Sequence, residues 1–443
     1  MARTRTAIAT LAGVAALAVA CAAPSDPEPP PQPATVRDSA GVTIVESATP
    51  MWRRANPSPG RLAPRPHLVL AWSESAPEQS PVDPVGVLRT ASGEIVVADG
   101  NRAGWQRLLV YDAEGRFLRH LGRRGEGPCE FMQVWRLEPY PGDSVAVFDM
   151  GRRSVVILGL DGGCGGSIAL PTSPPASPDR MRAGAFVGGV EGVFPDGTVL
   201  AYPMSYVDSV PAAPGPMWYR PRLLRLDRSG ATVAELGSFR LQQQHWDGTR
   251  VAQLHYGHVG ARALDGFDVI HGEGPGFELL RYDSTGALTQ VIRRAFTPQP
   301  VSDEDRVVAV TMRVVSGGSE RAARPGPSAG ASRSGAQAGP DPAALRERIA
   351  RAHWATHKPP FLRILVAPSG HIWVEHYRLA SPGLETDTTD PARWSVFNRA
   401  GEWLGEVDVP ASLHIRRVYE DAVMGIQQDD DGTTAVVVYP ILR

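Results

Sequence analysis

Four histidines in the middle of the sequence have the residue type and spacing of candidate metal ligands. His255 and His258 form an H-x-x-H pair, and His245 and His271 lie before and after it. Imidazole nitrogens bind zinc where three or four ligands converge on one point. The segment does not have the pattern of a helix, however, and no cysteine or clear carboxylate completes the set. We therefore predict polar loop residues here, and no metal or other cofactor.

Two other segments carry residue types that could do chemistry. The acidic run DDDG at residues 429–432 suggests calcium, but it lacks the alternate spacing and distal glutamate of an EF-hand loop, so we expect a hairpin turn. Glu375 in the segment HIWVEHY could be catalytic, although the alternation of the strand favours a cross-strand polar pair. The sequence contains no G-x-S-x-G elbow, phosphate loop or H-E-x-x-H motif, and we predict no catalytic residue.

A repeating unit of short strands must position these side chains. Its clearest copy spans residues 85–122, with turns at Ser92-Gly93 and Glu114-Gly115 between β-branched strands. Four antiparallel strands in about 40 residues make one blade of a β-propeller. Further copies begin near residues 133, 186, 261, 361 and 413, and their third strands end on similar segments: LVYDAEG, ILGLDGG, LRLDRSG, LRYDSTG and VFNRAG. The sequence therefore predicts an all-β protein, a six-bladed propeller.

The last copy is incomplete, because the sequence reaches Arg443 without a fourth strand for it. The segment HLVLAW at residues 67–72 precedes the first complete blade and could supply the missing outer strand. Pairing the two ends of the propeller in this way removes open sheet edges. We therefore expect a propeller over residues 67–443, closed by the strand at 67–72.

One blade carries a family resemblance. The segment from Asp83 to Phe131 resembles an NHL-type repeat, and its crossover glycines, proline, glutamate and phenylalanine match the pattern, while Cys129 replaces the final glycine. The segment DSAGVTIVES at residues 38–47 resembles the start of exported six-bladed propeller proteins of uncharacterised role. The resemblance implies a propeller used mostly for binding, with a few enzymatic members. Some six-bladed propellers are metal-dependent lactonases or related hydrolases, with acidic and amide ligands around the central channel.

Propeller ligands usually meet the mouth formed by the loops between strands two and three and between consecutive blades. In this chain those loops include residues 99–105, 123–131 and 244–258 and an insertion at residues 300–359. We predict ligand contacts from four residues in these loops: Arg123, Arg124, Trp246 and Tyr256.

The insertion between the fourth and fifth blades has three parts. Ser302 and Asp305 resemble a capping box before a helix, residues 316–340 have too little apolar content to fold, and Asp341-Pro342 starts a second short helix. We expect this helix to pack on one mouth of the ring, with a role in binding a partner as the alternative.

The cysteines bear on the compartment and on the fold. Cys129 lies in the crossover at the predicted mouth, whereas Cys164 lies in a turn between strands three and four, which should face the opposite side. A disulfide needs Cα atoms within about 7 Å of each other. We therefore predict that both thiols remain unpaired.

The N-terminus has the pattern of an export signal. Arg3 and Arg5 precede an uncharged apolar run at residues 7–20, which is too short to span a membrane. The segment LAVAC that ends at Cys21 resembles a lipobox, which predicts lipidation of this cysteine; conventional cleavage after A-x-A is the alternative. We thus expect a signal peptide at residues 1–20 and a proline-rich tether and N-terminal extension at 21–66.

These features together favour binding over catalysis. Ala22, and not an aspartate, follows Cys21, which indicates the periplasmic face of the outer membrane in the sorting logic of such lipoproteins. The net charge of −2 and the pI near 6.6 argue against a nucleic-acid partner. We predict a non-catalytic propeller that binds a small molecule or protein on a membrane surface. The alternative is a metal-dependent, lactonase-like hydrolase that uses the central channel.

Overall fold

The computed structural model describes ten segments of the chain, residues 32–52, 61–100, 106–171, 185–186, 188–203, 205–206, 211–311, 342–378, 391–429 and 432–442. The predicted signal peptide, Cys21 and the segment at 316–340 lie outside the described residues. No helix in the described part of the chain is long and apolar enough to cross a membrane.

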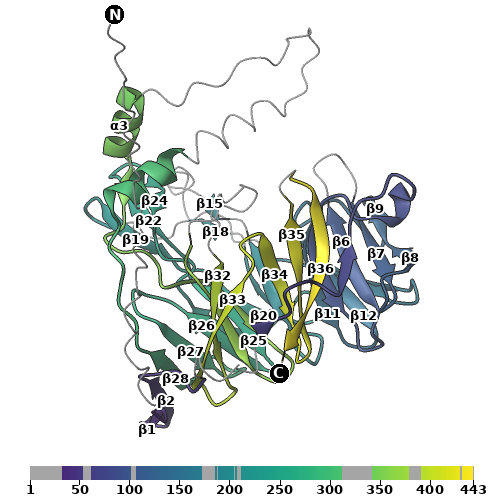
Figure 1. Cartoon of the computed structure of the whole chain (residues 1–443), viewed down its shortest axis with the longest axis horizontal. Coiled ribbons are helices and arrows are strands. Elements are labelled where there is room, and N and C mark those ends of the chain that lie inside the picture. The colour runs from purple at the N-terminus through teal and green to yellow at the C-terminus, as the bar shows by residue number, and fades with distance from the viewer. Residues whose placement is uncertain are drawn as a thin grey trace, which may run out of the picture. The chain divides into compact units, whose positions relative to one another are not determined.

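Six blades make up the body of the protein (Figure 1), which confirms the predicted all-β, six-bladed propeller. Four blades are four-stranded antiparallel sheets, and strands from the N-terminal part of the chain extend or complete the other two. The first blade contains β5 (Pro84–Arg89), β6 (Ile95–Gly100), β7 (Gln106–Tyr111) and β8 (Phe117–Leu121). The second contains β11 (Val134–Tyr140), β12 (Ser144–Asp149), β13 (Ser154–Gly159) and β14 (Cys164–Ala169). The third contains β16 (Gly189–Val193), β17 (Val199–Tyr202), β20 (Arg222–Leu226) and β21 (Thr232–Ser238).

The remaining blades follow the same order. The fourth contains β25 (Ala261–Asp265), β26 (Asp268–Gly272), β27 (Glu278–Tyr282) and β28 (Leu288–Arg294). The fifth contains β30 (Phe361–Val366), β31 (Ile372–His376), β32 (Ala392–Phe397) and β33 (Trp403–Val409). The sixth contains β34 (Leu413–Val418), β35 (Ala422–Gln428) and β36 (Thr434–Leu442). The first strands contact one another in a closed cycle, β5–β11–β16–β25–β30–β34–β5, and therefore surround one central channel.

The sixth blade is completed by an early segment of the chain. Strand β4 (Leu68–Leu70) pairs antiparallel with β36, with Val69 opposite Val437. Strand β3 (Arg61–Leu62) pairs with the last residues of β36. In Figure 1 the yellow C-terminal strands accordingly lie beside the blue strands of the first blade. A strand within the predicted segment 67–72 thus forms the outer edge of the sixth blade.

The N-terminal segment extends another blade. Strand β2 (Val42–Ser47) adds to the fourth blade by pairing parallel with β28, and β1 (Thr35–Ser39) pairs antiparallel with β2. Ala40 and Gly41, both with positive φ, make the turn between them.

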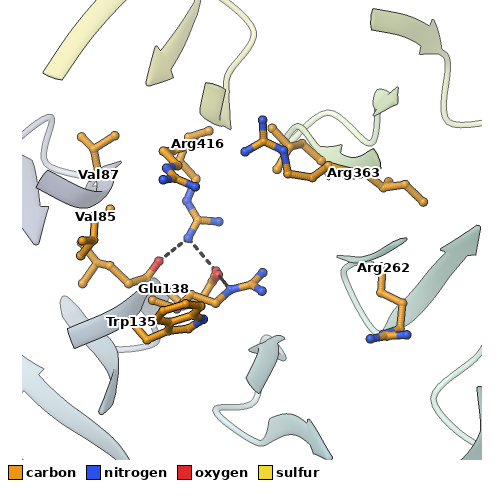
Figure 2. Close-up of a pocket in the computed structure, with 13 residues that line it drawn as sticks. Val85, Val87, Trp135, Glu138, Arg262, Arg363 and Arg416 are labelled. Atoms are coloured by element: carbon orange, nitrogen blue, oxygen red, sulfur yellow. Dashed lines mark hydrogen bonds and ion pairs between the residues drawn. The ribbon is translucent and has the colours of Figure 1, made fainter. Parts of the chain in front are cut away.

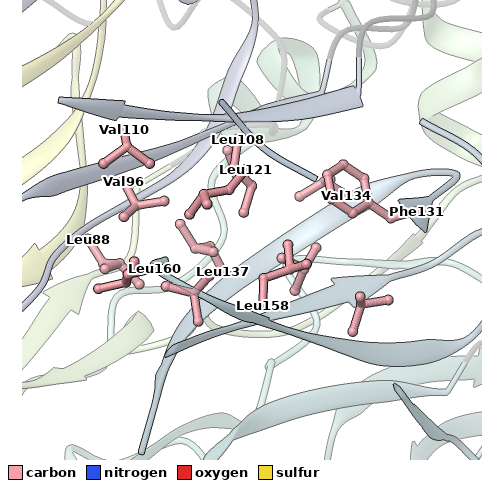
Figure 3. Close-up of a cluster of buried hydrophobic side chains, with 14 residues drawn as sticks. Leu88, Val96, Leu108, Val110, Leu121, Phe131, Val134, Leu137, Leu158 and Leu160 are labelled. Atoms are coloured by element: carbon pink, nitrogen blue, oxygen red, sulfur yellow. The ribbon is translucent and has the colours of Figure 1, made fainter. Parts of the chain in front are cut away.

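The core lies between neighbouring blades. Between the first and second blades, Leu88, Val96, Leu108 and Val110 pack against side chains of the second blade and against Phe131 (Figure 3). The second strands of these two blades, β6 and β12, are buried on both faces, and their sequences are accordingly apolar at consecutive positions.

The acidic residues that end the second strands in the first two blades have a structural role. The Asp99 carboxylate accepts hydrogen bonds from the backbone N–H groups of Val82 and Asp83, at 3.0 and 2.7 Å. Asp149 does the same for the N–H groups of Met132 and Gln133, at 2.8 and 2.9 Å. Each carboxylate thus fixes the chain where it enters the first strand of its blade.

The prediction of unpaired thiols was wrong, because Cys129 and Cys164 form a disulfide with a Cα–Cα distance of 5.6 Å. The crossover after β8 does not stay at the mouth. It turns at Gly122 and packs against Leu158 of β13, the strand partner of Cys164. The Sγ atom of Cys129 therefore lies 3.5 Å from the carbonyl oxygen of Ile157. Cys129 itself has a positive φ of 58°. Local turn rules do not predict this path of the crossover. It accompanies the burial of Phe131 between the first two blades.

A group of irregular segments, which we call the cap, gathers at one end of the molecule (Figure 1). It consists of β19 (Gly215–Tyr219), β22 (Gln242–Trp246), β23 (Val251–Ala252), β24 (Leu254–His255), β29 (His353–Trp354), α3 (Pro342–Arg351) and the helix at residues 303–311. Strands β24 and β29 pair in parallel, which joins the insertion to the chain before the fourth blade. The predicted capping box is present, since the Ser302 hydroxyl accepts the Asp305 N–H at 3.1 Å and Asp305 accepts the Ser302 N–H at 2.9 Å. Short pairs β15 (Ala185–Phe186) with β18 (Ser205–Tyr206) and β9 (Arg123–Arg124) with β10 (Glu130–Phe131) complete the structure.

Candidate functional site

Bulges in the first strands shape the central channel. The pairing register shifts by one residue in five of these strands, β5, β11, β16, β30 and β34. The extra residues are Val85, Trp135, Glu191, Leu362 and Arg416. A bulge leaves its extra residue outside the ladder and changes the direction in which the neighbouring side chains point. Consecutive residues of one strand, such as Arg416 and Arg417, can then both line the channel.

The channel contains a cavity of about 220 Å³ with an arginine-rich wall. Residues from β5, β11, β25, β30 and β34 line it, and Figure 2 shows Arg262, Arg363 and Arg416 around the same open space. The charged lining residues are Arg136, Glu138, Arg262, Arg363, Arg416 and Arg417. Trp135, with 59% of its surface exposed, adds an aromatic face to this wall.

Glu138 joins two of the channel arginines. Its carboxylate lies 2.6 Å from Nε of Arg136 and 2.8 Å from Nη2 of Arg417. Burial tends to raise the pKa of Glu138, but the attraction of Arg417 and Arg136 outweighs it and holds the pKa below its usual range. Glu138 is therefore an anion that neutralises part of the wall.

Two further glutamates, which do not themselves line the cavity, form ion pairs with channel arginines. Glu191 forms an ion pair with Arg262, and Glu375 lies 2.7 Å from Nη2 of Arg363. Arg363 and Glu375 are direct partners across β30 and β31, which confirms the predicted cross-strand polar pair. The Nη1 of Arg262, whose side chain is only 1% exposed, has no hydrogen-bond partner among the described residues.

Arg416 is the channel arginine without an acidic partner in the described part of the chain. Water reaches its side chain through the channel, yet the guanidinium is closely surrounded by protein. This burial, followed by repulsion from Arg363, lowers the pKa of Arg416 to about 10, so the group remains a cation at neutral pH. Five lining arginines face three glutamates, which leaves a surplus of two positive charges at the channel wall.

A second cavity, which we call the vestibule, adjoins the first at the sixth and first blades. It has a volume of about 620 Å³ and shares Val85 and Arg416 with the channel cavity. Its other lining residues are Trp72, His414 and residues at the end of β35, at and just before the start of β36, and at and just before the start of β5, where the acidic Asp83 lies. Arg416 therefore lies where the two cavities meet.

The sequence-predicted contact residues lie elsewhere, and none of them lines either cavity. Arg123 and Arg124 form β9 on the crossover, where Nε of Arg123 lies 2.7 Å from Glu130. Trp246 belongs to the cap, and Tyr256 directly follows its strand β24. Tyr256 is buried and donates its hydroxyl hydrogen to the Asp305 carbonyl at 2.9 Å, while Trp246 is half-buried. Contacts of these four residues with a ligand stay a prediction.

The histidine group does not converge. His271 bonds to Glu273 at 2.9 Å, His255 packs on Trp354, and the ring of His245 packs against that of His353. Within the described ranges, no three His, Cys, Asp or Glu side chains are placed so that they could hold a metal ion. The surplus positive charge of the channel also opposes a divalent cation. The described residues that line the channel therefore do not fit the metal of a lactonase-like site.

The channel arginines could have been found from the sequence by comparing the first strands of the repeats, which the motif search did not do. Each lies in a first strand, in the segments VWRLE, ARAL, FLRIL and HIRRV. An arginine at the same position of several blades points to the channel axis once the blades are aligned. The directions of the four arginines in β11, β30 and β34 still depended on bulges, whereas Arg262 lies in β25, whose pairing is regular.

Comparisons with known proteins support the fold. The family model DUF5128, described as a 6-bladed beta-propeller, matches residues 76–173, which contain the first two blades. No curated protein matches the chain.

Several solved structures resemble the chain at low identity. A protein from Bacteroides fragilis described as exported has 11% identity and a TM-score of 0.47, with 90% of this chain and 100% of that chain covered. A member of the DUF4221 family from Bacteroides vulgatus has 8% identity and a TM-score of 0.42, with 85% and 97% covered. A gluconolactonase from Xanthomonas campestris has 12% identity and a TM-score of 0.37, with 88% and 99% covered.

Proposed function

We propose that this protein is a non-catalytic binding propeller whose central channel takes an anionic small molecule. The observation that carries the proposal is Arg416, a cation in the channel with no acidic partner among the described residues. A guanidinium that protein surrounds closely and that has no counter-ion costs free energy, although water in the channel reduces that cost. A ligand with a carboxylate or phosphate group would supply that counter-ion.

The neighbouring residues support an anion site. Arg262 lines the same cavity and has a buried Nη1 without a hydrogen-bond partner among the described residues, and Arg363 lies close enough to lower the pKa of Arg416. Guanidinium groups bind carboxylates and phosphates through paired N–H donors. The lactonase-like alternative requires carboxylate or amide ligands for a metal at the axis, and the channel offers arginines instead.

We further propose that the propeller is exported and anchored by lipid at Cys21 on the periplasmic face of the outer membrane. The disulfide between Cys129 and Cys164 supports an oxidising compartment, since such bonds are rare in reducing cytosol. Mass spectrometry of the mature protein tests the anchor, because a lipidated cysteine at the new N-terminus adds the mass of the acyl groups. An unmodified N-terminus at residue 21 or 22 would contradict it.

Isothermal titration at low ionic strength tests the anion site, with inorganic phosphate, citrate and D-glucuronate as probes. Loss of a charge-assisted pair of about 1.5–3 kcal/mol corresponds to an affinity about 10- to 100-fold weaker. We therefore expect Arg416→Met to weaken binding by this factor. The matched control is Arg222→Met, since Arg222 is exposed and pairs with Glu235 outside the channel. The proposal fails if no probe binds the wild type, or if Arg416→Met binds every probe as tightly as the control does.

A further inference from the structure

The two adjoining cavities differ in chemistry. The channel cavity is small and cationic, with five arginines in its wall. The vestibule is larger. Arg416 at the junction and His414 are its basic side chains, and Asp83 is the acidic residue in its lining. Its volume of about 620 Å³ alone falls within the range of about 300–1,000 Å³ that is typical of small-molecule pockets. A single occupant of both cavities would need a compact anionic end and a larger uncharged body.

Trp72 gives the vestibule an aromatic face. It follows the closing strand β4, and 41% of its surface remains exposed although it is one of the largest apolar side chains. An indole combines a wide apolar face with a polar N–H at its edge. Such a face suits the C–H side of a saturated ring, which leaves the hydroxyl groups of that ring free to bond elsewhere.

Polar groups for those hydroxyls lie across the same cavity. Gln428, Thr433 and Thr434 come from the strand ends of the sixth blade, and His414 lies two residues before Arg416 on β34. The His414 side chain forms no hydrogen bond within the described ranges. Burial and the nearby Arg363 lower the pKa of His414 to about 4, so its imidazole is neutral at pH 7. A neutral imidazole can donate to one hydroxyl and accept from another.

We propose that the ligand is a hydroxylated ring with one acidic group, a sugar acid or a sugar phosphate. Its acidic group lies against Arg416 at the entrance to the channel, and its ring lies in the vestibule against Trp72. This inference rests on the anion site proposed above and specifies its ligand class. The acidic group can be a carboxylate or a phosphate, because both match the guanidinium fork.

Titrations with matched probes test the ligand class. D-glucuronate and glucose 6-phosphate carry both parts, inorganic phosphate and acetate carry only the anion, glucose carries only the ring, and benzoate carries an apolar ring. We expect at least one of the first two to bind about 10-fold or more tightly than every other probe, because only these two place an acidic group on Arg416 and a ring on the face of Trp72. Whether glucuronate or glucose 6-phosphate binds more tightly identifies the acidic group.

Variants of Trp72 separate this inference from the anion site itself. Trp72→Ala should remove the advantage of the ring-bearing anion and leave acetate and phosphate binding unchanged, while Trp72→Phe should keep most of it. Three outcomes would overturn the inference and leave the anion site intact. These are equal affinity for ring-bearing and simple anions, tighter binding of benzoate than of both sugar anions, and no effect of Trp72→Ala. Absence of binding by every anion would overturn both.

Discussion

Replacement of Arg416 by methionine should stabilise the ligand-free protein. Arg416 is the channel arginine without an acidic partner in the described residues, and it lies among other arginines. Methionine keeps a flexible chain about as long as the aliphatic part of arginine and removes the charged guanidinium. If the arginine is there for a ligand, its presence without that ligand should cost stability.

The size of this effect follows from the pKa. Burial and Arg363 lower the pKa of Arg416 from 12.5 to about 10. At about 1.36 kcal/mol per pKa unit the cost would be about 3 kcal/mol. Because water in the channel reaches the side chain and screens its charge, we expect about 1 kcal/mol. A basic group with a lowered pKa costs stability at all pH values below that pKa, so the cost is complete at neutral pH and is relieved only above pH 10.

Thermal unfolding at pH 7 and low ionic strength measures the effect. We expect the melting temperature of Arg416→Met to rise by about 1–2 °C over the wild type. Saturating phosphate or glucuronate should raise the melting temperature of the wild type and not that of the variant, because only the wild type binds the anion. Arg222→Met serves as the control for loss of an exposed arginine. A clear fall in the melting temperature of Arg416→Met, with no response of the wild type to any anion, would refute the reasoning.

Three further predictions concern the rest of the structure. Cys164→Ser should lower the free energy of unfolding by about 3–4 kcal/mol, the estimate for a bond that spans 35 residues, and reduction of the wild type should have the same effect in denaturant titrations; equal stability with and without reductant would contradict this. Glu138→Gln should destabilise the protein by about 3–5 kcal/mol, since Arg136 and Arg417 lose the negative charge that they share, and wild-type stability of the variant would contradict this. Because Arg417 and Arg136 hold the pKa of Glu138 below its usual 4.5, its contribution is present above that pH and is lost as the pH falls, so the melting temperature of the wild type should fall more steeply below pH 4 than that of Glu138→Gln; parallel curves would speak against this pairing.

The blades could be predicted because their determinants are local. Alternating or β-branched runs, glycine turns such as Ser92-Gly93, and an acidic residue at the end of a second strand all lie within a few residues of one another. Asp99 shows the physical basis, since its carboxylate binds two backbone N–H groups at the start of its own blade. The need for another strand in the sixth blade followed from counting the strands of each repeat, and β4 supplies that strand by pairing with β36.

The disulfide and the site could not be read in the same way. The pairing of Cys129 with Cys164 depends on the path of a crossover that buries Phe131 between two blades. The predicted contact residues were chosen from loops at the mouth, whereas the observed cavities are lined mainly by first strands.

The sequence by itself determined the repeated four-strand unit, the number of blades and the arginines of the first strands. Only the tertiary structure decided that five of those arginines line one cavity and that Arg416 has no acidic partner there within the described residues. A main reason is the bulge in each of five first strands, where one extra residue changes which side chains point to the axis. Arg262 is the exception, since it lies in the regular strand β25. A bulge depends on how strands distant in the sequence pack around a common channel, and no local pattern records it.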